Sequence, residues 1–463
     1  MKQQLEATLR DSAASRWAAL LILSFAMFGG YMFTEIISPL KTILERAYGW
    51  DSTDFGIVTS SYGLFNVFFL MLLIVGILLD KFGIRISNII SGVLMLVGGL
   101  IKYLAFKEVF SATDTINVLG IWQMKEQVFF AAFGYAIFGV GAEYAGITIS
   151  KALVKWFKGR EIALAMGIQV AIARLGSFGP LLLGAYFAGH YGVANWLFFG
   201  VLLLIAGLIA FLYYNMMDRK LDSQLNKTGE KTDEEEEFKI SDLSKIVANK
   251  GFWLITILCL LFYSAVFPFY KYGSDLMVNK FGVSEQWAGA IPSLLPLGTM
   301  LLTPVFGSIY DKKGKGASIM ILGAMILVVV HIIFYLPFLT NISFAIVNVL
   351  LLGVAFSLVP SAIWPSVPKI IPEKQLGSAY AVIFWIQNFG LWGIPLLIGI
   401  VLDKTNPQVG IAKAAGKIVP YDYSKTWLIF VVLTILAVFV SLMLKKEDRI
   451  KGYGLEKPNI NKE

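Results

Sequence analysis

Two residues of opposite charge each lie in the middle of a long apolar stretch of this sequence. Glu143 is in "FGVGAEYAGIT" and Arg174 is in "GIQVAIARLGSFGP". An ionised side chain at the centre of a bilayer costs about 2.5–3.5 kcal/mol on insertion scales, so each needs a partner or a function. The two could form a buried salt bridge. Alternatively, both could face a cavity and bind the ammonium and the carboxylate of a zwitterion, because a planar guanidinium bonds a carboxylate bidentately.

The helices that must carry these charges place them at one depth. We expect helices over residues 127–152 and 161–189, joined by a short loop. Each charge then lies about 12 residues, or about 18 Å, from the loop end of its helix, near the middle of a bilayer. Glycines flank both positions, and small residues let membrane helices pack closely.

Other polar and aromatic side chains form a second set of cavity candidates. Glu35 could carry a proton or could anchor the outer end of the first span. Lys271 and Asp275, in "YKYGSD", lie toward the outer end of the seventh span. Amide side chains could bond a substrate backbone or only join helices, and rings such as that of Tyr270 could wall a cavity or only pack. The second set is Tyr31, Glu35, Asn66, Tyr263, Trp364, Gln387 and Asn388.

The composition is that of a membrane protein and excludes several classes of function. The 463 residues are 57% hydrophobic and 15% charged, with a mean hydropathy of +0.71. One cysteine, Cys259, and two histidines exclude an internal disulfide and a His/Cys metal cluster. There is no Walker motif and no nucleophile triad, and the glycines near Glu143 follow no strand. We therefore expect no enzyme, no cofactor and no metal, and we interpret the formal charge of +8 as a report of membrane orientation rather than of nucleic-acid binding.

Apolar blocks of about 20 residues predict twelve membrane-spanning helices. They cover residues 16–40, 53–79, 84–106, 127–152, 161–189, 193–216, 251–279, 284–309, 317–339, 342–368, 375–402 and 425–444. The predicted domains are a six-helix bundle in 1–216, a linker in 217–250 that could hold a short interfacial helix, a second bundle in 251–444 and a tail in 445–463. An even number of spans puts both termini on one side, and the excess of Lys and Arg there predicts that this side is the cytoplasm.

A loop motif occurs twice, once in each half. The first copy, "GILLDKFGIR", follows the second span and contains Gly76, Asp80, Gly83 and Arg85. The second, "GSIYDKKGKG", follows the eighth span at a constant offset and contains Gly307, Asp311 and Gly314, without the arginine. Duplication of this kind marks a transporter built from two related bundles. We expect these loops to form a cytoplasmic gate in which Gly76, Asp80, Gly83, Arg85 and Asp311 take part.

These loops resemble the signature of the major facilitator superfamily. The resemblance implies an all-α polytopic membrane protein of the major facilitator fold, with 12 transmembrane helices in two six-helix bundles around a central cavity and with alternating access.

Longer blocks resemble one branch of that superfamily. "FGVGAEYAG", "WFKGREIALAMGIQVAIARLGS" and "IWPSVPKIIPEKQLGSAYAVIFWIQNFG" are similar to the branch of major facilitator superfamily domain-containing protein 1, a lysosomal dipeptide transporter. The resemblance implies that Glu143 binds the peptide ammonium, that Arg174 binds its carboxylate, and that transport is facilitated uniport. The alternative is a proton-coupled symporter or exporter of another small zwitterionic or anionic solute. The first span lacks the Glu-x-x-Glu-Arg signature of the proton-coupled peptide carriers, which favours uniport.

The remaining expectations concern location and partners. The N-terminal segment has no acidic dileucine motif of the lysosomal sorting kind, so we expect a bacterial relative in the inner membrane, with a lysosomal membrane as the alternative. The expected partners are a small-molecule substrate and the lipid bilayer. We expect a monomer without an accessory subunit.

Overall fold

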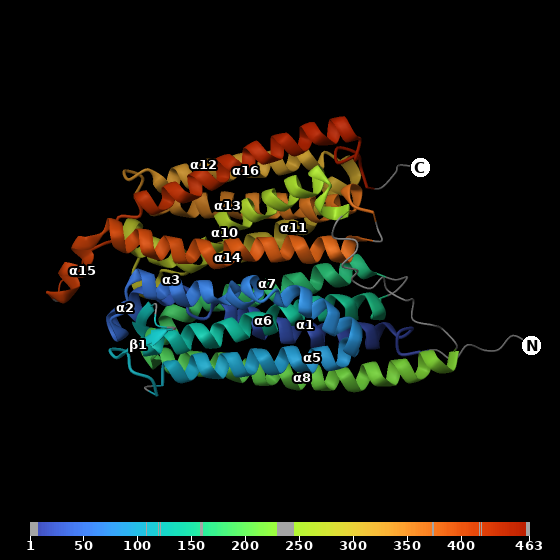
Figure 1. Ribbon diagram of the computed structural model, residues 1–463, viewed down its shortest axis with the longest axis horizontal. Coiled ribbons are helices and arrows are strands. Elements are labelled where there is room, and N and C mark those ends of the chain that lie inside the picture. The colour runs from blue at the N-terminus through green and yellow to red at the C-terminus, as the bar shows by residue number, and fades with distance from the viewer. Residues whose placement is uncertain are drawn as a thin grey trace, which may run out of the picture.

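The protein folds into two groups of long helices that run nearly parallel to one another (Figure 1). The computed structural model describes residues 8–107, 109–118, 120, 122–157, 161–228, 245–372, 375–415, 417 and 419–459. The first group, the N-terminal bundle, consists of α1 (Ala13–Glu35), α2 (Lys41–Tyr48), α3 (Ser52–Ser60), α4 (Leu64–Phe68), α5 (Met71–Ala105), α6 (Glu126–Trp156), α7 (Ile162–Tyr191) and α8 (Val193–Thr228). The second, the C-terminal bundle, consists of α10 (Lys250–Phe281), α11 (Leu294–Lys313), α12 (Gly316–Tyr335), α13 (Ile342–Ile370), α14 (Leu376–Thr405), α15 (Pro407–Ala414) and α16 (Ser424–Lys451).

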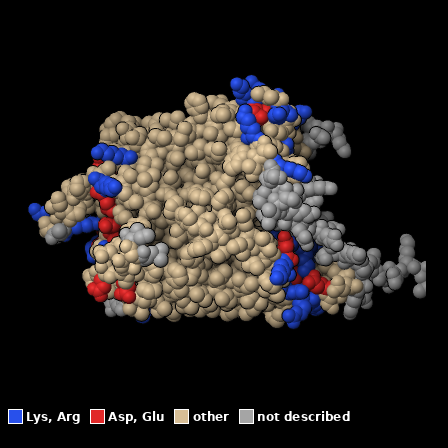
Figure 2. Space-filling view, in the orientation of Figure 1, with Lys and Arg blue, Asp and Glu red and all other residues tan. Residues whose placement is uncertain are grey.

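The two ends of the helices differ in what they carry. Both chain termini lie at one end, which we call the termini end, whereas α2, α15 and β1 lie at the opposite end, which we call the far end (Figure 1). Charged side chains gather at both ends, and a broad band without them separates the two (Figure 2). Such a band matches the hydrocarbon layer of a bilayer, so the membrane normal follows the helix axes.

Ten helices of the described residues are long and apolar enough to cross a membrane. The two remaining predicted spans correspond to α11 and to the segment from α3 to the first part of α5. The prediction of a continuous helix over 284–309 is wrong at its start, because residues 285–287 form a 3-10 turn and α11 begins only at Leu294.

The second predicted span, 53–79, is not continuous either. It breaks into α3, a 3-10 turn (Ser61–Gly63), α4 and the start of α5, with Leu70 in the left-handed region at φ 53°. The hydroxyls of Thr59, Ser60 and Ser61 each donate to a backbone carbonyl three or four residues earlier. Hydroxyls that bond back in this way compete with the helix ladder and bend it. The third span then follows in the same helix α5, across a bend at Gly83 with φ 71°.

Several connecting segments differ from the sequence prediction. Helix α8 continues to Thr228, so the first part of the predicted linker is helical. Residues 229–244, which include the acidic run 234–237 and the start of the expected interfacial helix, lie outside the described residues. At the far end, the connection between α5 and α6 forms a hairpin of β1 (Thr115–Val118) and β2 (Trp122–Lys125), which hydropathy does not predict.

Candidate functional site

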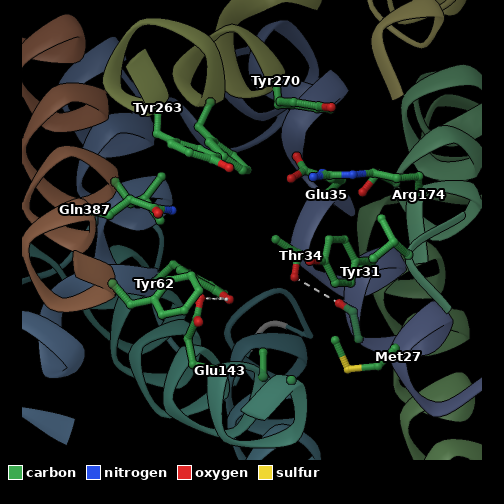
Figure 3. Close-up of a pocket in the computed structure, with 18 of the residues that line it drawn as sticks. Met27, Tyr31, Thr34, Glu35, Tyr62, Glu143, Arg174, Tyr263, Tyr270 and Gln387 are labelled. Carbon is green, nitrogen blue, oxygen red and sulfur yellow. Dashed lines mark hydrogen bonds between the residues drawn. The ribbon is translucent and has the colours of Figure 1, made fainter. Parts of the chain in front are cut away.

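A cavity of about 400 Å³ lies between the two bundles. Its lining comes from α1, α3, the 3-10 turn Ser61–Gly63, α5, α6 and α7 of the N-terminal bundle and from α10, α13 and α14 of the C-terminal bundle. It extends from Glu35 and Lys271 on the far side to Ser150 and Gln169, which lie in the termini halves of α6 and α7. Both Glu143 and Arg174 line this cavity (Figure 3).

Glu143 is held in place by a tyrosine from the broken second span. The Tyr62 hydroxyl donates a hydrogen bond to Glu143 Oε1 at 2.9 Å. The backbone at Tyr62 can approach α6 this closely because residue 139 is glycine, where a Cβ atom would lie 2.2 Å from the Tyr62 carbonyl oxygen. Sequence reasoning missed Tyr62, because the 3-10 turn at Ser61–Gly63 that carries it is not registered by hydropathy.

Arg174 lies on the opposite side of the cavity from Glu143 (Figure 3). Its guanidinium carbon is 5.8 Å from the ring centroid of Tyr31 and 5.3 Å from that of Phe356, so a ring from each bundle flanks it. No carboxylate of the described residues comes within 4.0 Å of its nitrogens. The alternative of a buried salt bridge between Glu143 and Arg174 is therefore not what the structure contains, and both charges remain available to a ligand.

The second set of candidates divides into residues that line the cavity and residues that do not. Tyr31, Glu35, Tyr263, Trp364 and Gln387 line it. Asn66 and Asn388 are fully buried outside it, and the side-chain oxygen of each has no hydrogen-bond partner among the described residues.

Glu35 joins the two bundles. Its carboxylate accepts from Lys271 Nζ at 2.7 Å and from the Ser38 hydroxyl at 2.6 Å. Lys271 also donates to the Thr34 carbonyl oxygen at 2.9 Å. Of the two roles considered for Glu35, this geometry corresponds to an anchor between α1 and α10.

Further bonds close the far end between the bundles. Asp275 of α10 accepts from Lys41 Nζ at 3.0 Å and from the Thr42 hydroxyl at 2.9 Å. Glu45 accepts from Lys413 at 2.7 Å, and Asp403 accepts from the Thr53 hydroxyl at 2.7 Å. Sequence reasoning identified Asp275 as a buried charge but offered no partner in the other bundle, because Lys41 and Thr42 lie more than two hundred residues away along the chain.

Two phenols outside the spans complete this far-end network. The Tyr421 hydroxyl donates to Glu45, and the Tyr423 hydroxyl donates to Asp275. Burial raises the pKa of Tyr421 and of Tyr423 above the ordinary value of a phenol. Both therefore stay protonated and act as donors to the carboxylates.

At the termini end, the first loop motif is bonded within its own bundle. Asp80 pairs with Lys151 of α6 at 2.9 Å, and Arg85 pairs with Asp222 of α8 at 2.6 Å. A Cβ atom at Gly76 or Gly83 of the motif would meet no other segment closely. At Gly83 the positive φ nevertheless favours a glycine.

The second loop motif is bonded to the C-terminal segment. The side-chain amide of Asn459 donates to Asp311 at 2.8 Å, and the Glu456 carboxylate accepts from the backbone and hydroxyl of Ser318. The last bond between described residues of the two bundles toward this end runs from Trp385 Nε1 to the Val67 carbonyl oxygen, at 3.0 Å. The bundles are thus bonded together at the far end and not, among the described residues, at the termini end.

Comparison with known proteins identifies the class to which this architecture belongs. Residues 23–394 match the model of the Major Facilitator Superfamily. The solved structure of the nucleoside transporter NupG has a TM-score of 0.66 at 16% identity, covering 92% of this chain and 99% of that one. That of a D-xylose-proton symporter has a TM-score of 0.64 at 14% identity, covering 92% and 97%. The fold is that of a two-bundle membrane transporter and not of an enzyme.

Sequence similarity identifies a branch within this superfamily. The chain is 32% identical over 408 residues to the lysosomal dipeptide transporter MFSD1 of Homo sapiens, covering 84% of this chain and 81% of that protein. The MFSD1 of Danio rerio is 30% identical over 399 residues, with the same coverage. The chain belongs to the Major Facilitator Superfamily, in the branch that includes these proteins, as the sequence motifs predict.

Proposed function

We propose that this protein carries dipeptides across a membrane by facilitated uniport. Glu143 binds the peptide ammonium and Arg174 binds the peptide carboxylate. The observation that carries the proposal is that two opposite charges, on opposite walls of one cavity, are not paired with each other. The similarity to the MFSD1 dipeptide transporters supports the same substrate class.

The cavity suits a substrate with variable side chains. Its volume of about 400 Å³ lies within the range of small-molecule pockets, about 300–1,000 Å³. The two termini are the charged groups that every dipeptide has in common, so a clamp on the termini recognises the class without selecting one sequence. The Tyr263, Phe267 and Trp364 rings offer a largely apolar wall to the side chains.

We further propose that the protein works by alternating access. In the present conformation the far end is closed by the Glu35–Lys271 and Lys41–Asp275 pairs, and the cavity reaches toward the termini end. Opening the far end requires these pairs to break. In the same movement the termini end closes, and the loop motif of each bundle comes into contact with the other bundle. Asp80, Arg85 and Asp311 are the gate residues in this proposal.

The distribution of Lys and Arg supports a termini end in the cytoplasm, and we propose a bacterial inner membrane as the location and a monomer as the working unit. A lysosomal location, as in the names of the curated relatives, is the alternative.

Purified protein in liposomes tests the proposed function. Liposomes loaded with unlabelled dialanine should take up labelled dialanine by counterflow without a pH gradient, and liposomes with the Glu143→Gln variant should not. Uptake that strictly requires a proton gradient would replace uniport with proton-coupled symport. Binding without any flux, at several pH values and for several dipeptides, would contradict transport altogether.

A further inference from the structure

The two charges proposed to bind the ends of the peptide both come from the N-terminal bundle. These charges are Glu143 and Arg174, whereas Lys271 of the C-terminal bundle is already engaged by Glu35. A substrate that draws the bundles together must also bind the C-terminal bundle. The polar groups that this bundle presents to the cavity are therefore the places to look for a second contact.

Among these groups the Tyr270 hydroxyl is buried and has no hydrogen-bond partner among the described residues, although Tyr270 lines the cavity. By contrast, the Tyr263 hydroxyl accepts from Trp364 Nε1 at 3.3 Å, and Gln387 Oε1 accepts from the Cys259 thiol at 3.4 Å. A buried hydroxyl without a partner is costly to maintain, so one on a residue that lines a cavity points to a ligand group that satisfies it.

Tyr270 lies on the same side of the cavity as Arg174. Figure 3 shows the Tyr270 hydroxyl and the Arg174 guanidinium in the same part of the cavity, with Glu143 across it. The flanking rings of Tyr31 and Phe356 restrict the guanidinium. A carboxylate placed between the two residues has enough lone pairs to accept two N–H bonds from Arg174 and one O–H bond from Tyr270.

We infer that Tyr270 is the second half of the carboxylate site and that the substrate carboxylate links the two bundles. This inference rests on the proposed function and extends it by adding a specificity-determining residue. Arg174 supplies the charge from α7, and Tyr270 supplies a hydrogen bond from α10. The next residue, Lys271, holds Glu35 and the Thr34 carbonyl of α1, so the carboxylate site adjoins the bonds that close the far end.

The test compares Tyr270→Phe with Tyr263→Phe, using dialanine and dialanine amide as ligands. The dissociation constant of each ligand is measured by titration and checked by thermal stabilisation. A hydrogen bond to a charged group contributes enough to change affinity about ten-fold or more. Tyr270→Phe should therefore lower the acid-to-amide affinity ratio about ten-fold or more. Tyr263→Phe removes a cavity hydroxyl whose oxygen already accepts from Trp364, and it should lower this ratio less than Tyr270→Phe does.

The unliganded stability of the variants separates a binding role from a structural one. Removing a hydroxyl that has no partner should leave the melting temperature of Tyr270→Phe at or above that of the wild type. A lower melting temperature with an unchanged acid-to-amide ratio would assign Tyr270 a structural role only. If the wild type binds dialanine and Tyr270→Phe leaves the acid-to-amide affinity ratio unchanged, the inference about Tyr270 is overturned and the proposed function stands. If the wild type binds no member of a dipeptide panel, both the proposed function and this inference fail.

Discussion

Asp275 provides the sharpest test of how the far end is closed. Its carboxylate accepts from Lys41 and Thr42 of the N-terminal bundle and from Tyr423 of its own bundle. The Asp275→Asn variant keeps the shape of the side chain but removes the charge and one of the two acceptor oxygens. Lys41 retains Glu45 at 2.7 Å as a partner, so the change weakens the closure without leaving a lone buried cation.

The magnitude follows from the two bonds that cross between the bundles. Hydrogen bonds to charged groups contribute about 1.5–3 kcal/mol each. These bonds exist only while the far end is closed, whereas water solvates the same groups when it is open. Weakening both hydrogen bonds should destabilise the closed conformation by about 2–4 kcal/mol. This lowers the ratio of closed to open protein about 30- to 1,000-fold.

A distance measurement across the far end detects this change in the ratio of closed to open protein. Spin labels at Tyr191, which is 64% exposed at the end of α7, and at Phe338, which is 72% exposed after α12, report the separation of the two bundles. The labels are introduced in a Cys259→Ser background. Asp275→Asn should add a population at longer distance that the wild type lacks.

A matched control lies at the other end of the same bundle. Asp311 also accepts a side-chain amide bond, from Asn459, but the bond stays within the C-terminal bundle. Asp311→Asn should leave the far-end distances unchanged. If Asp275→Asn gives the same distance distribution as the wild type, the reasoning that these bonds hold the far end closed is refuted.

Three further changes test other parts of the structure. Tyr62→Phe removes the donor to Glu143 and should weaken dialanine binding about 5- to 30-fold in a titration, without loss of folded protein; unchanged affinity would speak against a positioning role. Gly139→Ala forces the Tyr62 backbone away from α6 and should lower both affinity and melting temperature; an alanine variant that matches the wild type in both would contradict the close packing. Ending the chain after Lys451 removes the fully buried Leu455 and should lower the melting temperature of the protein, with a stable truncation as the opposing result.

The sequence predicted the parts of the fold that the bilayer dictates. A membrane helix must be apolar and must bond its own backbone, so spans and the two halves follow from hydropathy and the repeated loop. Equal depth along two antiparallel helices led to the expectation that Glu143 and Arg174 could share a cavity, and both residues line the cavity of the structure. Their roles toward a substrate remain predictions.

The sequence could not predict features that depend on distant contacts. The break that begins at Ser61 accompanies hydroxyls that bond back to the backbone, and it ends at the left-handed Leu70; hydropathy registers neither feature. The partners of Asp275 and the unsatisfied hydroxyl of Tyr270 appear only when the two bundles meet. Position along the spans selected Asn66 and Asn388 as candidates, but the direction of a side chain around its helix decides whether it reaches the cavity.

Glu143 and Arg174 are proposed to bind the two ends of a dipeptide. The most direct test of this proposal is the affinity of dialanine for the wild type, for Glu143→Gln and for Arg174→Ala, each first shown to be folded in the membrane. We predict that each variant loses about 100-fold or more in affinity, since each leaves one charged terminus of the peptide without its partner in a buried site. A variant of either residue that binds dialanine as tightly as the wild type would contradict the proposal.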